Sequence, residues 1–188
     1  MRARVNAARD EMLTEVDRLP ADDETRQKAL GRCSVVLSYR ACTEHELRTK
    51  LKASEFEPAV IDWAIEKCID SGLVNDLRYA TSFVGSRLRR GHGLMRIHND
   101  LTKRGLARPL VDEAWQAHQD EHELEHGEGT ARGLTTAAAE QALRKQYDAE
   151  KLADSALRAK ATRFLAGRGF NYSEIDAAMR AVRAQDAR

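Results

Sequence analysis

Residues 96–115, RIHNDLTKRGLARPLVDEAW, carry the apolar pattern of residues 46–65, ELRTKLKASEFEPAVIDWAI, at an offset of 50. Leu101 aligns with Leu51 and Val111 with Ile61, with no gap between them. Apolar residues that recur three or four positions apart are typical of amphipathic helices. The repeat therefore predicts at least two copies of one helical module.

A third copy begins further along the chain, at an offset of 64 from the second. The clearest shared step is Arg104-Gly105-Leu106, which recurs as Arg168-Gly169-Phe170. A glycine in this position ends a helix with a positive φ, and the apolar residue that follows folds back on the last turn. We therefore expect Gly105 and Gly169 to close equivalent helices.

The composition agrees with a helical chain. Of 188 residues, 42% are hydrophobic, 32% are charged and only 3 are proline, and no strand pattern stands out. We predict an all-α fold of three tandem three-helix modules, stacked into an elongated, curved array because each module alone buries little apolar surface. The predicted segments are an N-terminal helix (1–21), module 1 (22–75), module 2 (76–126), a glycine-rich link (127–134) and module 3 (135–188).

Helix start and stop signals mark module 1. A helix capped by Asp22 or Asp23 and running to about Ser38 comes first, and Thr43 with Glu46 then forms a Thr-x-x-Glu capping box. Pro58 starts the third helix and Gly72 ends it. We expect that helix to bury three isoleucines, Ile61, Ile65 and Ile69.

Cysteine usage and hydropathy bear on the compartment. Cys33, Cys42 and Cys68 contain no Cys-x-x-Cys pair, so we expect reduced, buried thiols. No apolar run approaches the ~18 residues of a spanning helix. We expect a cytoplasmic protein with no membrane partner.

The charges are arranged in blocks along the chain. Residues 76–111 carry a net charge of +6, and residues 112–128 carry −7 with no Lys or Arg. The blocks favour two surfaces of opposite charge, and a single helix with one acidic end is the alternative.

The candidate binding residues are basic. The denser set lies in residues 86–105 and the weaker set in module 3, and together they are Arg87, Arg89, Arg90, Arg96, Lys103, Arg104, Arg144, Lys145, Arg163 and Arg168. Such a set contacts nucleic acid or an acidic protein groove. The alternatives are a solvated face for the first set and stabilisation of a helix end for the second. Tyr79 and Phe83 lie one turn apart beside the first set, where packing or base stacking are both open.

A His-Glu-x-x-His match occurs at His122, Glu123 and His126. Charged residues surround the match, whereas a catalytic zinc helix packs on apolar residues, so we expect neither a metalloenzyme nor a cofactor. His118, His122 and His126 recur every fourth residue and are candidates for weak, adventitious metal binding only.

Motifs over residues 27–183 resemble the bacterial RecX family. They are Thr43-Glu44-His45-Glu46-Leu47, Gly72-Leu73-Val74-Asn75-Asp76, Tyr79-Ala80, Phe83-Val84, Ser86-Arg87, Gly91-His92-Gly93, Arg96-Ile97, Arg104-Gly105-Leu106 and Arg163-Phe164-Leu165-Ala166-Gly167-Arg168-Gly169-Phe170. Asn75 stands where the family usually has Asp, and Asn caps a helix equally well.

The resemblance implies a regulator without catalytic activity that binds the RecA recombinase filament. It implies binding along the groove of the filament, with strand exchange, ATP hydrolysis and coprotease activity damped. We expect a monomer, with single-stranded or double-stranded DNA as a further possible partner. The alternative is a plain helical DNA-binding module without a recombinase partner.

Overall fold

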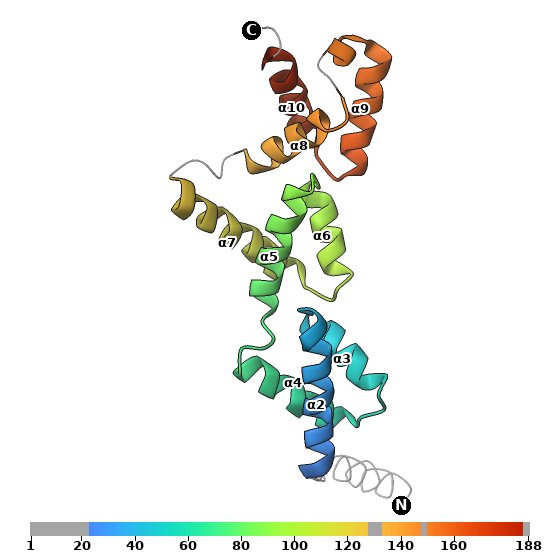
Figure 1. Cartoon of the computed structure of the whole chain (residues 1–188), viewed down its shortest axis with the longest axis vertical. Coiled ribbons are helices and arrows are strands. Elements are labelled where there is room, and N and C mark those ends of the chain that lie inside the picture. Colours follow the sequence, from blue (N-terminus) through green and yellow to red (C-terminus); the bar gives the residue numbers. More distant parts are fainter. Residues whose placement is uncertain (1–22, 128–132, 148–149, 186–188) are drawn as a thin grey trace, which may run out of the picture. The chain divides into compact units, whose positions relative to one another are not determined.

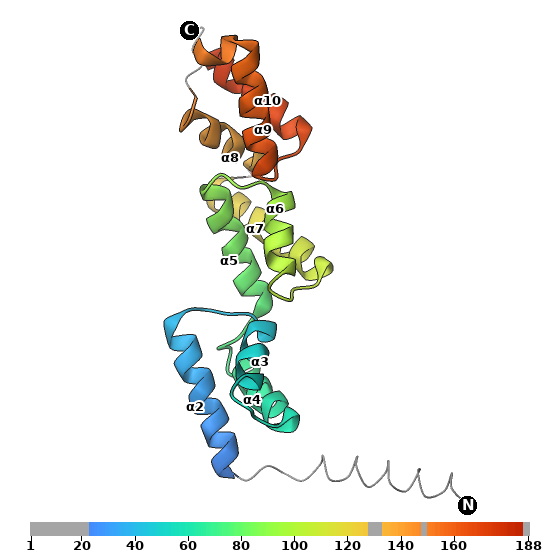
Figure 2. The ribbon, with the colours of Figure 1, turned by 90° about the vertical axis from the view of Figure 1, so that its right-hand side faces the viewer.

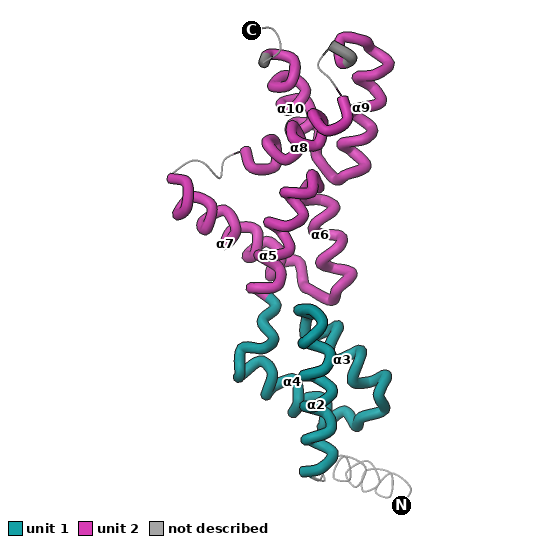
Figure 3. The backbone as a smooth tube through the Cα atoms, in the orientation of Figure 1, with its two compact units in different colours: residues 1–76 teal, residues 77–188 magenta. Residues whose placement is uncertain are grey.

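The computed structural model describes residues 23–127, 133–147 and 150–185 (Figure 1). Within these ranges the chain forms nine α-helices and one short 3₁₀ helix, with no strand. The prediction of an all-α fold is confirmed. The chain divides into two compact units, residues 1–76 and 77–188 (Figure 3).

The described part of unit 1 is built from α2 (Asp23–Tyr39), α3 (Glu44–Lys52) and α4 (Pro58–Asp70). Its buried core includes Leu47, Leu51 and Ile61, the residues that the repeat aligns. The predicted cap of α3 is confirmed, since the Thr43 hydroxyl accepts a hydrogen bond of 3.1 Å from the backbone N–H of Glu46.

One expectation for α4 is wrong. Ile61 and Ile65 are buried, but Ile69 is 45% exposed. Ile69 belongs to the last turn of α4, where Gly72, at φ +70°, reverses the chain so that Val74 takes the buried position. The backbone N–H of Val74 donates to the carbonyl of Cys68 at 3.0 Å and holds this turn closed.

All three cysteines are buried as free thiols in unit 1, as predicted. Burial, and after it the neighbouring Cys68, raise the pKa of the Cys33 thiol to about 12. A thiol with this pKa stays protonated at neutral pH, which makes it a poor nucleophile.

Unit 2 begins with α5 (Asp76–Arg89, whose first residue belongs to unit 1), α6 (Leu94–Thr102) and α7 (Arg108–His126). It continues with α8 (Leu134–Arg144), the 3₁₀ helix η1 (Glu150–Ala153), α9 (Ser155–Gly167) and α10 (Tyr172–Gln185). Gly105 and Gly169 have φ values of +86° and +87°, so the predicted equivalence of the two turns is confirmed.

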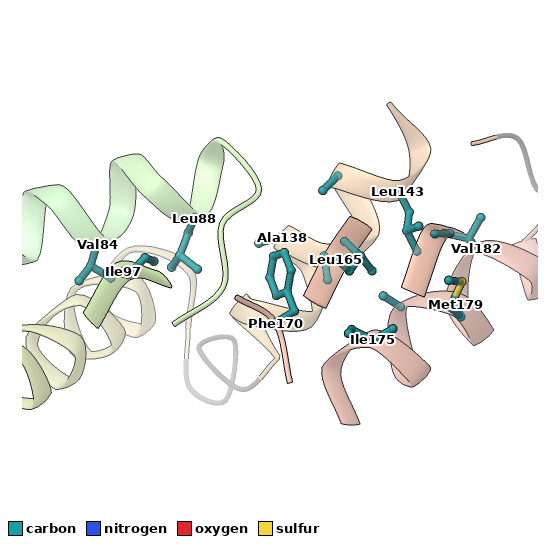
Figure 4. Close-up of a cluster of buried hydrophobic side chains, with 14 of the residues drawn as sticks. Val84, Leu88, Ile97, Ala138, Leu143, Leu165, Phe170, Ile175, Met179 and Val182 are labelled. Atoms are coloured by element: carbon teal, nitrogen blue, oxygen red, sulfur yellow. The ribbon is translucent and has the colours of Figure 1, made fainter. Parts of the chain in front are cut away.

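The core of unit 2 is continuous from α5 and α6 through to α10 (Figure 4). Val84, Leu88 and Ile97 belong to the same buried cluster as Leu165 and Phe170. The second and third modules therefore share one hydrophobic core.

A backbone joint fixes α6 against the end of α9. The N–H of Gly93 donates to the carbonyl of Arg168 at 2.9 Å, and the N–H of Met95 donates to the carbonyl of Gly169 at 3.3 Å. These bonds satisfy amides at the start of α6, where Gly93 offers no side-chain cap. The start of α6 lies beside the end of α9 in both ribbon views (Figure 2).

The approach is so close that neither glycine can be replaced without a shift. A Cβ on Gly93 would lie 2.2 Å from the carbonyl oxygen of Gly169, and a Cβ on Gly169 would lie 2.5 Å from the backbone N of Arg96.

The predicted N-terminal helix (1–21) and most of the link (127–134) lie outside the described residues, so the segment boundaries stay predictions. No helix in the described part of the chain combines the length and the apolar character needed to cross a membrane.

Candidate functional site

The first group of candidate arginines packs on aromatic rings of α5. The guanidinium of Arg87 lies 4.7 Å from the ring centre of Phe83, and that of Arg104 lies 5.3 Å from the same ring. Tyr79 stacks beside Phe83 with ring centres 6.1 Å apart. The sequence left both packing and base stacking open for Tyr79 and Phe83, and these contacts show packing.

Stacking on a ring orients a guanidinium but leaves its N–H edge available. Arg87 also forms an ion pair with Asp100, whose carboxylate lies 3.5 Å from the guanidinium. We call Arg87 and Arg104 the stacked pair. Its chemistry suits a planar carboxylate or a phosphate.

A second group meets at the joint between α5, α8 and α9. A hollow of about 160 Å³ there is lined by Arg90, Lys145 and Arg168, together with Gln141 and Gln146. Its remaining lining residues are Gly91, Ala142 and Phe164, so no carboxylate lines it. We call Arg90, Lys145 and Arg168 the joint cluster, and three cations around one hollow make a site for an anionic group.

Arg168 also has a structural role. Its Nη1 donates to the carbonyls of Arg90 and Gly91, both at 3.1 Å, and its guanidinium lies 4.6 Å from the ring centre of Phe164. The side chain therefore ties the end of α9 to the end of α5.

A third pair lines a shallow groove of about 320 Å³ between α6 and the end of α9. Arg96 and Lys103 lie there with the exposed Met95 and with Asp100. The Nη1 of Arg96 is 3.4 Å from the carbonyl of Gly167, a long contact with the α9 end. Asp100 lowers the net positive charge of this groove relative to the joint cluster.

The remaining candidates lie elsewhere on unit 2. Arg89 lines a different cavity beside His118, and Arg144 pairs with Glu140 at 3.0 Å. Arg163 is exposed on α9. Helix α5 ends at Arg89 and Arg90 belongs to the turn that follows, so the two neighbours in sequence line different hollows.

The histidines of the His-Glu-x-x-His match lie on the last turns of α7. The rings of His122 and His126 stack with centres 4.3 Å apart, and Leu124 between them is 90% exposed. Among the described residues, no three His, Cys, Asp or Glu side chains come together to hold a metal ion. The described residues therefore offer no set of metal ligands that would support a metalloenzyme.

Comparison with known proteins decides the family. Family models for the first, second and third three-helix domains of RecX match residues 26–68, 75–114 and 135–179. The regulatory protein RecX of Vibrio campbellii is 33% identical over 145 residues, covering 77% of this chain and 84% of the relative. The chain belongs to the RecX family. RecX of Chromohalobacter salexigens is 34% identical over 160 residues, covering 85% of this chain and 90% of the relative.

Solved RecX structures have the same fold. The crystal structure of RecX from Lactobacillus salivarius superposes with a TM-score of 0.69 at 24% identity, over 85% of this chain and 97% of that one. A second RecX crystal structure gives a TM-score of 0.62 at 20% identity. The predicted resemblance and the three tandem three-helix domains are thus confirmed.

Sequence reasoning missed two features of this RecX chain. The joint between Gly93 and Gly169 joins turns 76 residues apart, and no local pattern reports such a contact. The cavity beside Arg89 was also missed, although the acidic, His-rich stretch that supplies one of its walls was visible within residues 112–128.

Proposed function

We propose that this RecX chain regulates a RecA-type recombinase by binding its filaments on single-stranded DNA. Bound chains would lower strand exchange, ATP hydrolysis and coprotease activity, acting as monomers in the bacterial cytoplasm. Membership of a family of regulatory proteins supports a regulatory role. The recombinase as partner is the step that this proposal adds.

The joint cluster is the observation that carries the proposal. It brings three cations from two tandem modules around a hollow without a carboxylate. The shared core and the backbone joint hold those modules in a fixed arrangement. A rigid cationic site recognises a regularly spaced acidic or phosphate-bearing surface at low entropic cost, and a filament presents such a surface.

The stacked pair and the groove of Arg96 and Lys103 extend the cationic surface of unit 2. Arg87 pairs with Asp100, and the same carboxylate lines the groove of Arg96 and Lys103, so both are weaker sites for an anion than the joint cluster. We assign them to orientation of the partner, because charges at the edge of an interface affect the association rate more than the final affinity.

Hydrolysis of ATP by the cognate RecA on single-stranded DNA tests the function directly. Titration with this chain should suppress hydrolysis at ratios well below one chain per recombinase subunit. Unchanged hydrolysis at a ratio of one to one would contradict the proposal.

A plain DNA-binding module is the second candidate, because the joint cluster also suits a phosphate. Binding to bare DNA whose affinity falls steeply with salt, with no effect on the recombinase, would favour that function instead.

A further inference from the structure

A cavity between α5, α7 and α8 shares Gln141 with the hollow of the joint cluster but is lined by none of the three cations of that cluster. Its volume is about 720 Å³, within the range of ligand-binding pockets. In Figure 1, α7 crosses α5 and runs away from it, and α8 lies above the upper end of α5; the cavity is lined by all three helices. The proposed function does not use it.

All three helices present a face to this cavity. The lining of α5 consists of Thr81, Ser82, Gly85, Leu88 and Arg89, that of α7 of His118, Glu121, His122, Glu125 and His126, and that of α8 of Leu134, Ala137, Ala138 and Gln141. In α7 and α8 the lining residues follow the pattern i, i+3, i+4, i+7, which means that one continuous stripe of each helix faces the cavity. A cavity walled by helical stripes has the shape that a further helix fills.

The two main walls differ in chemistry. The α8 wall, with Leu134, Ala137 and Ala138, is apolar, whereas the α7 wall carries the carboxylates of Glu121 and Glu125. These acids lie one turn apart, so they repel each other, and a cation placed between them relieves that repulsion. Arg89 on α5 is the only Lys or Arg among the lining residues.

The acidic wall is the part of α7 that extends past its repeat. The second-domain family model ends at residue 114, while α7 continues to His126. Over residues 112–128 the chain has seven acids and no Lys or Arg. That charge disfavours a nucleic acid or an acidic peptide as the occupant.

We propose that this cavity is a docking slot for a cationic amphipathic helix of a partner protein. The apolar side of the helix would lie on Leu134, Ala137 and Ala138, and its Lys or Arg residues would reach Glu121 and Glu125. The slot is a binding site separate from the joint cluster, and the proposal does not depend on the recombinase being the partner.

The test uses the full chain and a fluorescent 14-residue peptide of Leu and Lys with helical periodicity, next to a Leu and Glu peptide of the same pattern. Fluorescence anisotropy should show saturable binding of the Lys peptide at one per chain and no binding of the Glu peptide. Equal binding of the two peptides would overturn the proposal.

Variants place the binding in the slot. Glu121→Gln with Glu125→Gln should weaken binding about tenfold, since two charges are lost. Glu113→Gln with Asp120→Asn removes the same charge from α7 outside the lining and should leave the affinity within about twofold of the wild-type value. Equal losses in both double variants would show binding by net charge alone and overturn the slot.

Ala137→Trp fills the slot from the exposed side of α8 and should abolish binding, with circular dichroism confirming the fold. The glutamate pair keeps the proposal testable should that variant fold poorly. Sedimentation of the wild type without peptide tests whether a second copy of the chain fills the slot. A dimer that Glu121→Gln with Glu125→Gln dissociates would show that it does, and would overturn the proposal of a partner helix.

Discussion

At the scale of single residues, glycine determines where modules can touch. Gly169 combines a φ of +87° with a backbone neighbour 2.5 Å from its would-be Cβ. Gly167, two residues earlier at the end of α9, has nothing within 4 Å of the same position. Alanine substitutions at Gly169 and Gly167 therefore compare the stability cost of a side chain at a strained, crowded position with that of replacing a glycine in open space.

Gly169→Ala should lower the free energy of unfolding by about 2–4 kcal/mol, because the new methyl group is strained at positive φ and collides with α6. Gly167→Ala should leave stability unchanged or slightly raised. Urea unfolding followed by circular dichroism measures both. Equal stability of the two variants would show that the joint tolerates a side chain.

Histidine burial gives unit 2 a pH dependence. His118 sits against Gly85 of α5, where burial lowers its pKa, and His122 and Arg89 lower it further against the opposing effect of Glu121 and Glu125. The folded state therefore resists protonating His118, while the unfolded chain takes up the proton near pH ~6.5.

Stability should consequently be complete above that pH and fall as the pH drops through it, because the unfolded state then binds more protons. His118→Gln should flatten the fall in unfolding free energy between about pH 7.5 and about pH 5.5. The pKa of His92 is also lowered, by burial and by Arg96, so the unfolding free energy of the variant should still fall with decreasing pH, but less steeply. Identical slopes for variant and wild type would remove His118 from the pH response.

At the scale of elements, the end of α9 is held by a side chain as well as by backbone. Arg168→Ala removes two hydrogen bonds to α5 and its turn and the contact with Phe164. The expected loss in unfolding free energy is about 1–3 kcal/mol.

Arg163→Ala is the control, since this arginine is exposed on the same helix. Its effect should stay within about 0.5 kcal/mol. Differential scanning calorimetry of the two variants compares them. An Arg168→Ala midpoint equal to that of Arg163→Ala would mean that the Arg168 side chain does not support the fold.

The elements themselves were predictable because their ends carry local signals. Thr43, Pro58, Gly105 and Gly169 act through their own backbone neighbourhood, so sequence identifies them. Ile69 was misplaced because its exposure depends on how Gly72 redirects the chain, which periodicity does not report.

The site was less predictable than the fold. Sequence reasoning grouped neighbouring arginines, but Arg87, Arg89 and Arg90 diverge around α5 to an aromatic stack, a cavity and a joint. Lys145 comes to Arg90 only through packing between modules, so no spacing in the sequence shows that they share a hollow.

At the scale of the whole molecule, opposite charges are separated within unit 2. The +6 block supplies Arg90 of the joint cluster and the −7 block supplies the acidic wall of the slot. The chain therefore has a small net charge, although its basic and acidic residues gather at different places in unit 2. With the two proposed sites, the chain would contact an anionic and a cationic surface at once.

Salt should act on filament binding through the cationic site. Raising the ionic strength from about 0.05 M to about 0.3 M should weaken binding of the wild type and have a smaller effect on Arg90→Gln with Lys145→Gln, which has fewer charges to screen. Light scattering from filaments at each salt concentration provides the comparison. Parallel salt dependence of the two proteins would place the main ionic contact elsewhere.

Affinity for preformed recombinase filaments on single-stranded DNA tests the central claim most directly. Arg90→Gln with Lys145→Gln should bind about tenfold more weakly than the wild type, while Lys50→Gln with Lys52→Gln, a matched change on exposed lysines of α3, should bind within about twofold of it. Equal affinity of all three proteins, with helicity unchanged, would contradict the assignment of the joint cluster as the filament-binding site.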